Sequence, residues 1–244
     1  MILVRSWLYT ILFLIWTLSA AIVCLPALVH RRAALGAIRM WVRGVMALAR
    51  GLVGIRFRVE GKENIPRGPC IIAAQHQSSF ETYRLFLEVD DPVFVLKREL
   101  VWIPFVGWYI LRAGLVPIDR GAGAGAMRRM LRAADAAVAR GAQVLIFPEG
   151  TRTPPGVRRP YRPGVAALYN HCRVPLVPMA LNSGYFWGKT RVRKEPGEIV
   201  FKFLPPVEQG LGKDDLLATL RDRLERAAAT LPARGVSEAT EVRR

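Results

Sequence analysis

Apolar positions follow three patterns along the chain. Residues 6–29 carry no charged side chain, residues 30–54 place arginines and apolar side chains on opposite sides of a helix, and short apolar runs follow from residue 55 onward. Short runs predict strands, and the periodic segments between them predict helices. This alternation indicates an α/β domain over residues 55–231, with a mixed, largely parallel central sheet flanked by helices.

The pattern assigns most of this domain to short strands and helices. The apolar runs predict strands at residues 55–59, 70–74, 92–96, 115–118, 143–147, 176–181 and 199–204. Helical periodicity predicts helices at residues 79–88, 126–140, 164–171 and 214–230, the last of them exposed, and short helical turns over 97–111. The glycines of residues 121–125 indicate a flexible link. Residues 232–244 are predicted to be a disordered tail.

The uncharged N-terminal stretch is long enough to enter a membrane. A helix needs about 20 apolar residues to cross a bilayer, and residues 6–29 meet that length. Pro26 is expected to end or kink this helix. A cleaved signal peptide is the alternative, because Ser19-Ala20-Ala21 resembles a cleavage site, although the apolar part of a signal peptide is shorter.

Residues 30–54 have the pattern of a basic amphipathic helix. At helical spacing, four arginines fall along one line and the apolar side chains on the other side; the arginines are Arg32, Arg39, Arg43 and Arg50. This pattern indicates a helix in the membrane interface; a soluble helix with a solvated arginine face is the alternative. Residues 1–54 are therefore predicted to form a two-helix membrane anchor, either a span with an interfacial helix or a hairpin in one leaflet. Arginines after the first helix place the rest of the chain in the cytoplasm.

Charge and cysteine content narrow the possible partners. A net charge of +17 indicates an anionic partner: a phosphate-bearing substrate, an anionic membrane, an acidic carrier protein or nucleic acid. The basic residues are spread along the chain without a long run, which argues against nucleic acid. The three cysteines, Cys24, Cys70 and Cys172, lack the spacing of metal ligands, so neither a metal site nor a disulfide is predicted.

Polar motifs follow three of the predicted strands. His76 and Glu81 come after strand 70–74, Asp119 and Arg120 after strand 115–118, and Pro148-Glu149-Gly150-Thr151-Arg152 after strand 143–147. In α/β sheets the site forms at the carboxyl ends of the strands. We therefore expect these motifs to share one site.

His76 is the candidate general base. If His76 lies in a loop and the helix begins at residue 78 or 79, Glu81 can reach back to the imidazole and fix its tautomer. Ser78-x-x-Glu81 is also a capping box, and the residues alone leave these two roles of Glu81 equally open. Gly150 allows a ligand close to the backbone, and Arg152 is a forked donor suited to phosphate.

Four blocks resemble the glycerolipid acyltransferase family, in particular the bacterial 1-acylglycerol-3-phosphate acyltransferases. Residues 76–81 are similar to the family's His-x4-Asp block, and residues 114–120 to its Gly-x-x-x-Ile-Asp-Arg block. Residues 147–152 look like its acceptor-binding block, and residues 174–178 like its proline-containing strand. The sequence departs from the family at Glu81, where aspartate is expected, which puts the tight histidine–carboxylate geometry in doubt.

The resemblance implies acyl transfer from a thioester, either acyl-CoA or an acyl-carrier protein, to the free hydroxyl of 1-acylglycerol-3-phosphate, giving phosphatidate. It implies that His76, with Glu81, is the base on that hydroxyl, and that no metal, cofactor or covalent enzyme intermediate is needed. The residues expected to hold the acceptor are Arg120, Glu149, Gly150, Thr151, Arg152 and Lys97. The expected location is the inner membrane, with the catalytic domain on its cytoplasmic face.

Two other functions compete with this interpretation. One keeps the chemistry and changes the acceptor to another lysolipid, for example a lyso-ornithine lipid. The other is a basic, membrane-tethered protein that binds nucleic acid or anionic lipid without catalysis. The ordered block at residues 147–152 has no role in the second account.

Overall fold

The computed structural model describes residues 1–119, 123–188 and 192–233 of the chain. Arg120 and the part of the predicted tail from residue 234 onward lie outside these ranges. The described strands are β1 (Ile55–Glu60), β2 (Cys70–Ala74), β3 (Pro92–Lys97), β4 (Val116–Ile118), β5 (Gln143–Ile146), β6 (Leu176–Leu181) and β7 (Gly197–Phe203). The α-helices are α1 (Ile2–Val23), α2 (Arg31–Val53), α3 (Phe80–Glu88), α4 (Val106–Arg112), α5 (Gly123–Ala139), α6 (Gly164–Cys172), α7 (Ser183–Phe186) and α8 (Lys213–Ala229). Three 3-10 helices connect them: η1 (Leu25–Val29), η2 (Lys62–Asn64) and η3 (Arg98–Trp102).

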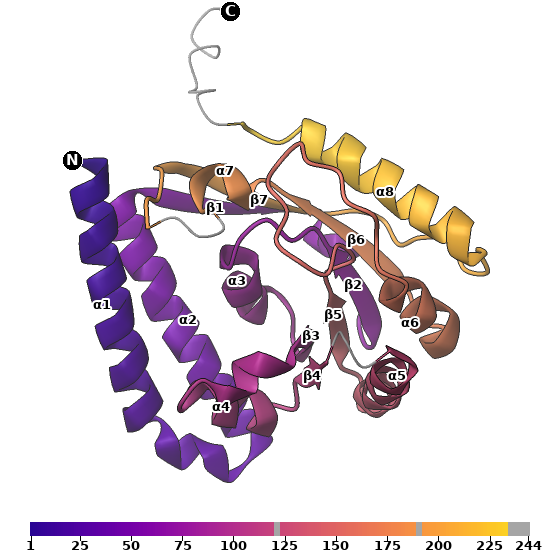
Figure 1. The fold of residues 1–244 in the computed structure, drawn as a ribbon, viewed down its shortest axis with the longest axis horizontal. Helices are drawn as coiled ribbons and strands as arrows, with labels where there is room; N and C mark the ends of the chain where they lie inside the picture. The colour runs from indigo at the N-terminus through magenta and orange to yellow at the C-terminus, as the bar shows by residue number, and fades with distance from the viewer. Residues whose placement is uncertain (120–122, 189–191, 234–244) are drawn as a thin grey trace, which may run out of the picture.

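The strands form one mixed sheet in the order β1-β7-β6-β2-β5-β3-β4. Neighbours pair in parallel except β6 and β7, which are antiparallel. The prediction of a mixed, largely parallel α/β sheet flanked by helices is confirmed (Figure 1). Because β2, β5 and β6 run in parallel side by side, their carboxyl ends meet at one edge of the sheet.

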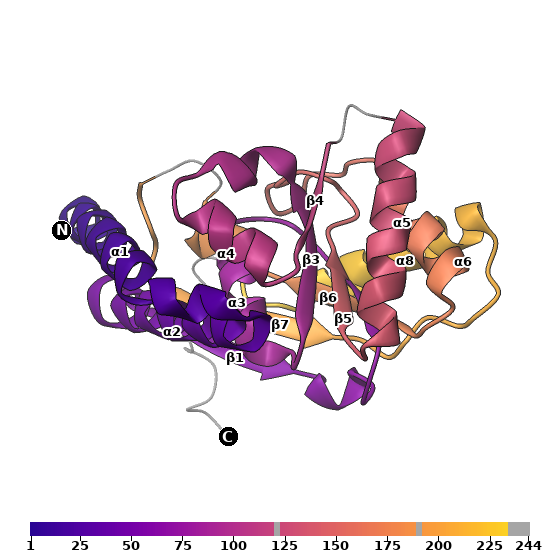
Figure 2. The ribbon, with the colours of Figure 1, turned by 90° about the horizontal axis from the view of Figure 1, so that it is seen from below.

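Helices cover both faces of the sheet. In β2 the side chains of Cys70, Ile72 and Ala74 join one hydrophobic cluster, and those of Ile71 and Ala73 join the other, as the two-residue period of a strand requires. The first cluster lies under α2 and α3, and the second under α5, α6 and α8 (Figures 1 and 2). A strand buried on both faces is a continuous apolar run, which is why β2 was predicted with its observed limits.

Two expectations about the second half of the chain were wrong. Helix α8 is not simply exposed, because Leu216, Leu220 and Leu224 are fully buried against the sheet. Their spacing of four places them on one side of the helix, while charged residues cover the other. Helix α5 already begins at Gly123, inside the predicted flexible link.

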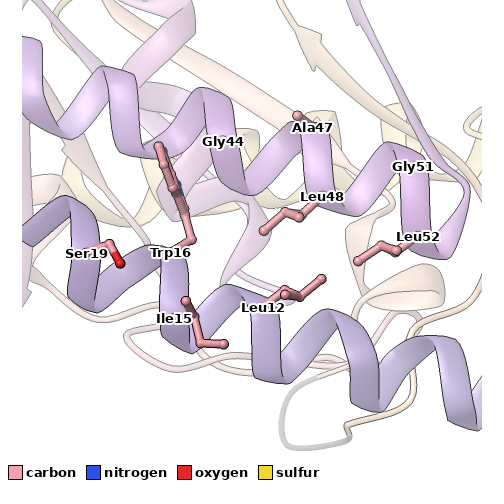
Figure 3. A pocket seen from close by; sticks show the side chains of 9 residues that line it. All are labelled: Leu12, Ile15, Trp16, Ser19, Gly44, Ala47, Leu48, Gly51 and Leu52. Atoms are coloured by element: carbon pink, nitrogen blue, oxygen red, sulfur yellow. The ribbon is translucent and has the colours of Figure 1, made fainter.

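Helix α1 lies on the outside of the molecule and exposes a row of large apolar side chains. It is the one described helix that is long and apolar enough to cross a membrane, by length and composition. It ends at Val23, and Pro26 lies in the η1 turn that follows, as expected. The ring of Trp16 in α1 lies directly against Gly44 of α2, where a Cβ atom would approach it to 2.3 Å. Beside this contact an apolar groove separates the two helices (Figure 3).

Helix α2 does not rest its apolar side on a membrane, which corrects the prediction of an interfacial helix. Val42 and Val45 are fully buried against the α/β domain, with α2 packed against α3, α4 and β1. Arg39, one of the aligned arginines, donates to the backbone carbonyls of Phe86 (3.1 Å) and Val89 (3.2 Å) at the C-terminal end of α3. A cation there interacts favourably with the helix dipole. The other three aligned arginines remain exposed.

Candidate active site

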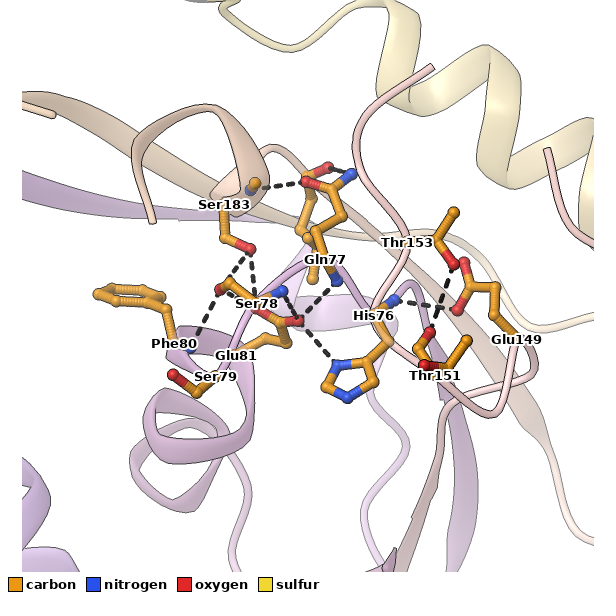
Figure 4. A network of polar contacts seen from close by, with 12 residues as sticks. His76, Gln77, Ser78, Ser79, Phe80, Glu81, Glu149, Thr151, Thr153 and Ser183 are labelled. Carbon is orange, nitrogen blue, oxygen red and sulfur yellow. Dashed lines mark hydrogen bonds and ion pairs between the residues drawn. The ribbon is translucent and has the colours of Figure 1, made fainter. Parts of the chain in front are cut away.

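The polar motifs that follow β2, β5 and β6 meet at one edge of the sheet. His76 follows β2, Glu149 follows β5, and Ser183 opens α7 directly after β6. β2 lies between the other two strands, so His76 lies at the centre of this group (Figure 4). Of the three motifs predicted to share one site, residues 76–81 and 147–152 lie together here. In the third motif, Asp119 pairs with Arg98 and Arg120 lies outside the described ranges, so its place in this site stays a prediction.

The imidazole of His76 is held by a buried carboxylate. Nδ1 of His76 lies 2.9 Å from Oε1 of Glu81, whose side chain is fully buried. The His76 side chain retains 15% exposure, and its second ring nitrogen points away from Glu81 (Figure 4). A neutral imidazole with Nδ1–H directed at a carboxylate has Nε2 as its basic nitrogen.

Glu81 also closes the turn that begins α3. Its Oε1 accepts from the backbone N–H groups of Gln77 (2.7 Å) and Ser78 (2.6 Å). The Ser78 hydroxyl, 2.7 Å from Oε2 of Glu81, accepts from the Phe80 N–H at 3.0 Å. The structure therefore shows the contact with His76, and the same carboxylate also holds the backbone of the turn before α3. The N-cap of α3 itself is Ser79, which makes no side-chain cap bond.

A second serine completes the surroundings of this carboxylate. Oγ of Ser183 lies 2.7 Å from Oε2 of Glu81 and 2.9 Å from Oγ of Ser78 (Figure 4). With the imidazole, two backbone amides and two hydroxyls, five donors surround the two oxygens. Burial alone would raise the pKa of Glu81, but the hydrogen bonds from His76 and Ser78 and the charge of His76 outweigh it, so the pKa lies below its usual value.

The loop after β5 holds the backbone of His76 from the other side. The His76 N–H donates to Oε2 of Glu149 at 3.0 Å, and the Thr153 N–H donates to the His76 carbonyl at 2.7 Å. The ring of Phe147 stacks on the imidazole, with centroids 4.0 Å apart and planes 16° apart. The backbone and the ring plane of His76 are therefore both fixed by residues 147–153.

Glu149 thus has a structural contact that the sequence did not predict. It was expected to hold substrate, and here one of its oxygens faces the His76 amide. Burial raises the pKa of this carboxyl to about 8, partly opposed by the backbone hydrogen bonds of Glu149 and His76. The neutral form therefore predominates below that pH.

Gly150 and Arg152 lie at the turn of the same loop. Gly150 has a φ of +66°, and a Cβ atom there would lie 3.0 Å from Cγ of Arg162, so a larger residue would be strained. Arg152 acts electrostatically on Tyr83 of α3: burial raises the pKa of the Tyr83 phenol, and the Ser79 hydrogen bond and the charge of Arg152 oppose this. In the same loop the Thr153 hydroxyl donates to the Thr151 carbonyl at 3.3 Å.

Lys97 lies at the end of β3, two strands from β2. Its ammonium pairs with Glu99 at 2.9 Å, while Arg98 pairs with Asp119 at 3.3 Å. The structure thus gathers His76, Glu81 and Glu149 into one network and places Lys97 outside it. No group of His, Cys, Asp or Glu in the described ranges is arranged to hold a metal ion.

Residues after β6 were missed. Besides Ser183, the Gly184 N–H donates to Oε1 of Gln77 at 2.9 Å, and Nε2 of Gln77 donates to the Leu181 carbonyl at 2.9 Å. The signal was present, because the polar run Asn182-Ser183-Gly184 directly follows a buried strand. What the sequence did not reveal is that β6 lies beside β2.

Comparison with known proteins identifies the family of this chain, with its fold and its histidine–carboxylate pair. A family model described as Acyltransferase matches residues 56–182, and the chain belongs to this acyltransferase family. It is 37% identical over 188 residues to a 1-acyl-sn-glycerol-3-phosphate acyltransferase of Pseudomonas aeruginosa, covering 77% of this chain and 73% of the relative.

More distant relatives extend the same likeness. The 1-acyl-sn-glycerol-3-phosphate acyltransferase alpha of Mus musculus is 30% identical over 221 residues, covering 88% of this chain and 77% of the relative. The crystal structure of the 1-acyl-sn-glycerophosphate acyltransferase PlsC from Thermotoga maritima has the same fold, with a TM-score of 0.76 and 24% identity. The match covers 96% of this chain and all of the other.

Proposed function

We propose that this chain transfers a fatty acyl group from an acyl thioester to the free hydroxyl of 1-acylglycerol-3-phosphate, giving phosphatidate. The observation that carries the proposal is the 2.9 Å contact between Nδ1 of His76 and the buried Glu81, with the second ring nitrogen pointing away. The names of the relatives supply the acceptor. The donor is acyl-CoA or an acyl-carrier protein.

His76 acts as general base in this reaction. Its Nε2 takes the proton of the acceptor hydroxyl while the hydroxyl oxygen attacks the thioester carbonyl carbon. The tetrahedral intermediate collapses, the C–S bond breaks, and the proton passes from the imidazolium to the sulfur. Glu81 remains ionised at Nδ1 and stabilises the imidazolium between the two transfers. The step consumes one thioester and one alcohol and releases one ester and one thiol, without a resident cofactor.

The loop after β5 has two roles in the proposal. Glu149 and Thr153 hold the His76 backbone, and Phe147 holds its ring. The left-handed conformation of Gly150 leaves its backbone without a side chain for a ligand to approach, and Arg152 supplies a forked cation for the acceptor phosphate. Thr151, Arg120 and Lys97 complete the proposed acceptor-binding residues.

The proposed location is the inner membrane, with the α/β domain on its cytoplasmic face. Helix α1 supports it, because its outer side is apolar and its length suffices to cross a bilayer. Helix α2 joins the anchor through its contact with α1 and carries exposed arginines suited to anionic lipids. Residues 1–54 would thus carry the catalytic domain on the membrane that contains its lipid acceptor.

An acyl-transfer assay tests the proposal. Membranes containing the full chain are given a labelled acyl thioester and a panel of lysolipids that includes lysophosphatidate and lyso-ornithine lipid. We expect labelled phosphatidate from the wild type and none above background from His76→Ala, since a positioned base contributes typically 10²–10⁴-fold. Near-normal turnover by His76→Ala would exclude the mechanism, and product from a different lysolipid only would exclude the proposed acceptor.

A further inference from the structure

The segment from η3 to α4, residues 98–112, exposes bulky apolar side chains to solvent. Trp102 is 77% exposed, Trp108 53% and Leu111 54%, with Leu100 and Ile103 exposed beside them. Exposed aromatic and aliphatic side chains in such density mark an interaction surface. The proposed catalytic mechanism uses none of them.

The backbone of this segment is held in an unusual conformation. Phe105 has φ 63° and ψ −50°, and the Val106 N–H donates to the Pro104 carbonyl at 2.7 Å. This is a γ-turn of the rare strained kind. Directly after it, a Cβ atom on Gly107 would lie 1.8 Å from the carbonyl oxygen of Val101. Such strain persists only where the surroundings enforce it, and it clusters at functional segments.

The segment is joined to the end of the proposed membrane helix. The Tyr109 hydroxyl donates to the Ala21 carbonyl in the last turn of α1 at 3.0 Å. Helix α4 also contacts η1 and α2, and both overall views place it beside them (Figures 1 and 2). The apolar surface of α1 therefore continues onto α4. In the same last turn, Ile22 and Val23 are exposed.

The polar surroundings of the segment match a lipid surface. Arg98 and Arg112, at its two ends, are exposed. Tryptophan prefers the level of the lipid headgroups, and arginines nearby attract anionic headgroups. A protein partner would not require continuity with α1, whereas one bilayer can cover both surfaces.

We infer that residues 98–112 form a second membrane-inserting element, whose partner is a bilayer of anionic lipids. The inference rests on the proposed membrane location of α1. Because η3 directly follows β3, whose carboxyl end lies at the same sheet edge as His76, insertion of this element turns that edge toward the bilayer. A lysolipid acceptor then reaches the site from the membrane rather than through water.

Tryptophan quenching in vesicles tests the insertion. The full chain is bound to phosphatidylglycerol vesicles with and without brominated acyl chains, and wild type is compared with Trp102→Phe. We expect the brominated chains to remove less tryptophan emission from Trp102→Phe than from wild type, because one of the tryptophans in contact with the acyl chains is missing. An equal loss of tryptophan emission in both proteins would overturn the inference, and it would leave the proposed membrane location of α1 untouched. A wild type that does not bind the vesicles would instead overturn the membrane location.

A kinetic comparison separates insertion from a folding defect. Trp102→Asp is expected to raise the KM for vesicle-embedded lysophosphatidate about tenfold or more, with kcat unchanged on a monomeric short-chain lysophosphatidate. Ala218→Asp adds the same charge at an exposed position of α8, across the sheet, and is expected to change neither. An unchanged KM in Trp102→Asp, or equal losses on both substrates, would refute the role.

Discussion

Ser183→Ala tests the least expected part of the site. The Ser183 hydroxyl is fully buried and lies 2.7 Å from Oε2 of Glu81. It comes from α7, more than a hundred residues after His76 in the chain. The substitution removes one of the five donors around the carboxylate and leaves the backbone amides of Gln77 and Ser78 in place. It therefore weakens the support of Glu81 without touching His76.

The magnitude follows from the burial of the acceptor. A hydrogen bond to a charged group contributes about 1.5–3 kcal/mol, and no water can replace it at a fully buried oxygen. If the loss falls on the transition state, in which Glu81 faces an imidazolium, kcat decreases about tenfold to a hundredfold. Any part of the lost hydrogen-bond energy that stabilised the native state instead of the transition state decreases the free energy of unfolding.

The pH dependence distinguishes this role from general destabilisation. The pKa of Glu81 lies below its usual value only because hydrogen bonds and the charge of His76 outweigh burial. A carboxyl with a depressed pKa in the folded state stabilises the protein above its unfolded pKa, and this stabilisation is lost as pH falls through the folded pKa. Without Ser183 the pKa of Glu81 rises, so the acid limb of kcat moves to higher pH.

The assay is kcat and KM against pH with a vesicle-embedded acceptor, together with urea unfolding. Ser6→Ala is the matched control, because Ser6 is also a fully buried serine and bonds to the Ile2 carbonyl and the Lys194 N–H, not to Glu81. We expect the acid limb to move in Ser183→Ala alone. An unmoved acid limb with full kcat, or the same displacement in Ser6→Ala, would refute the reasoning.

Three further predictions concern the loop and the scaffold. Glu149→Gln keeps an acceptor for the His76 amide, so kcat should stay within about threefold. Because burial raises the pKa of Glu149 from 4.5 to about 8, the free energy of unfolding of the wild type should fall as pH rises between these two values and level off above about 8, whereas that of the variant should not fall, as urea unfolding will show. Arg152→Ala should raise the KM for lysophosphatidate about tenfold with little change in kcat if it binds phosphate, whereas a lowered kcat at unchanged KM would argue for a role in positioning. Gly61→Ala should destabilise the protein by about 1–3 kcal/mol in urea unfolding, because φ is +67° and the new Cβ would lie 2.1 Å from a carbonyl oxygen; Gly36→Ala, in open space on α2, should stabilise it, and the opposite order would contradict the structure.

The strands could be predicted closely because the central ones are buried on both faces. β2 and β6 are continuous apolar runs, and the structure gives both of them the predicted limits. The surroundings of a helix are harder to predict, since an apolar stripe has the same form whether it faces lipid or protein. Leu216, Leu220 and Leu224 were overlooked within a highly charged helix, and the apolar side of α2 was assigned to the membrane although it packs on the domain.

The site could be predicted only where its residues follow one another in the chain. His76 and Glu81 are five residues apart, and their contact needed only a helix that begins after the histidine. Ser183 and Glu149 reach the same site from β6 and β5, and only the order of strands in the sheet brings them there. Strand order is a property of the whole fold, and no local spacing in this chain encodes it.

The glutamate at position 81, where the family resemblance leads one to expect aspartate, is understandable from the same contacts. Its carboxylate accepts from the Ser78 amide, three residues earlier, in the turn that leads into α3. The same oxygen, Oε1, lies 2.9 Å from Nδ1 of His76, so the longer side chain reaches the imidazole from the first turn of a regular helix. The other carboxylate oxygen, Oε2, then accepts from the hydroxyls of Ser78 and Ser183. The start of α3, the state of the carboxylate and the orientation of the base therefore depend on one side chain. Removal of either hydroxyl donor, Ser78 or Ser183, should alter the pH dependence of catalysis.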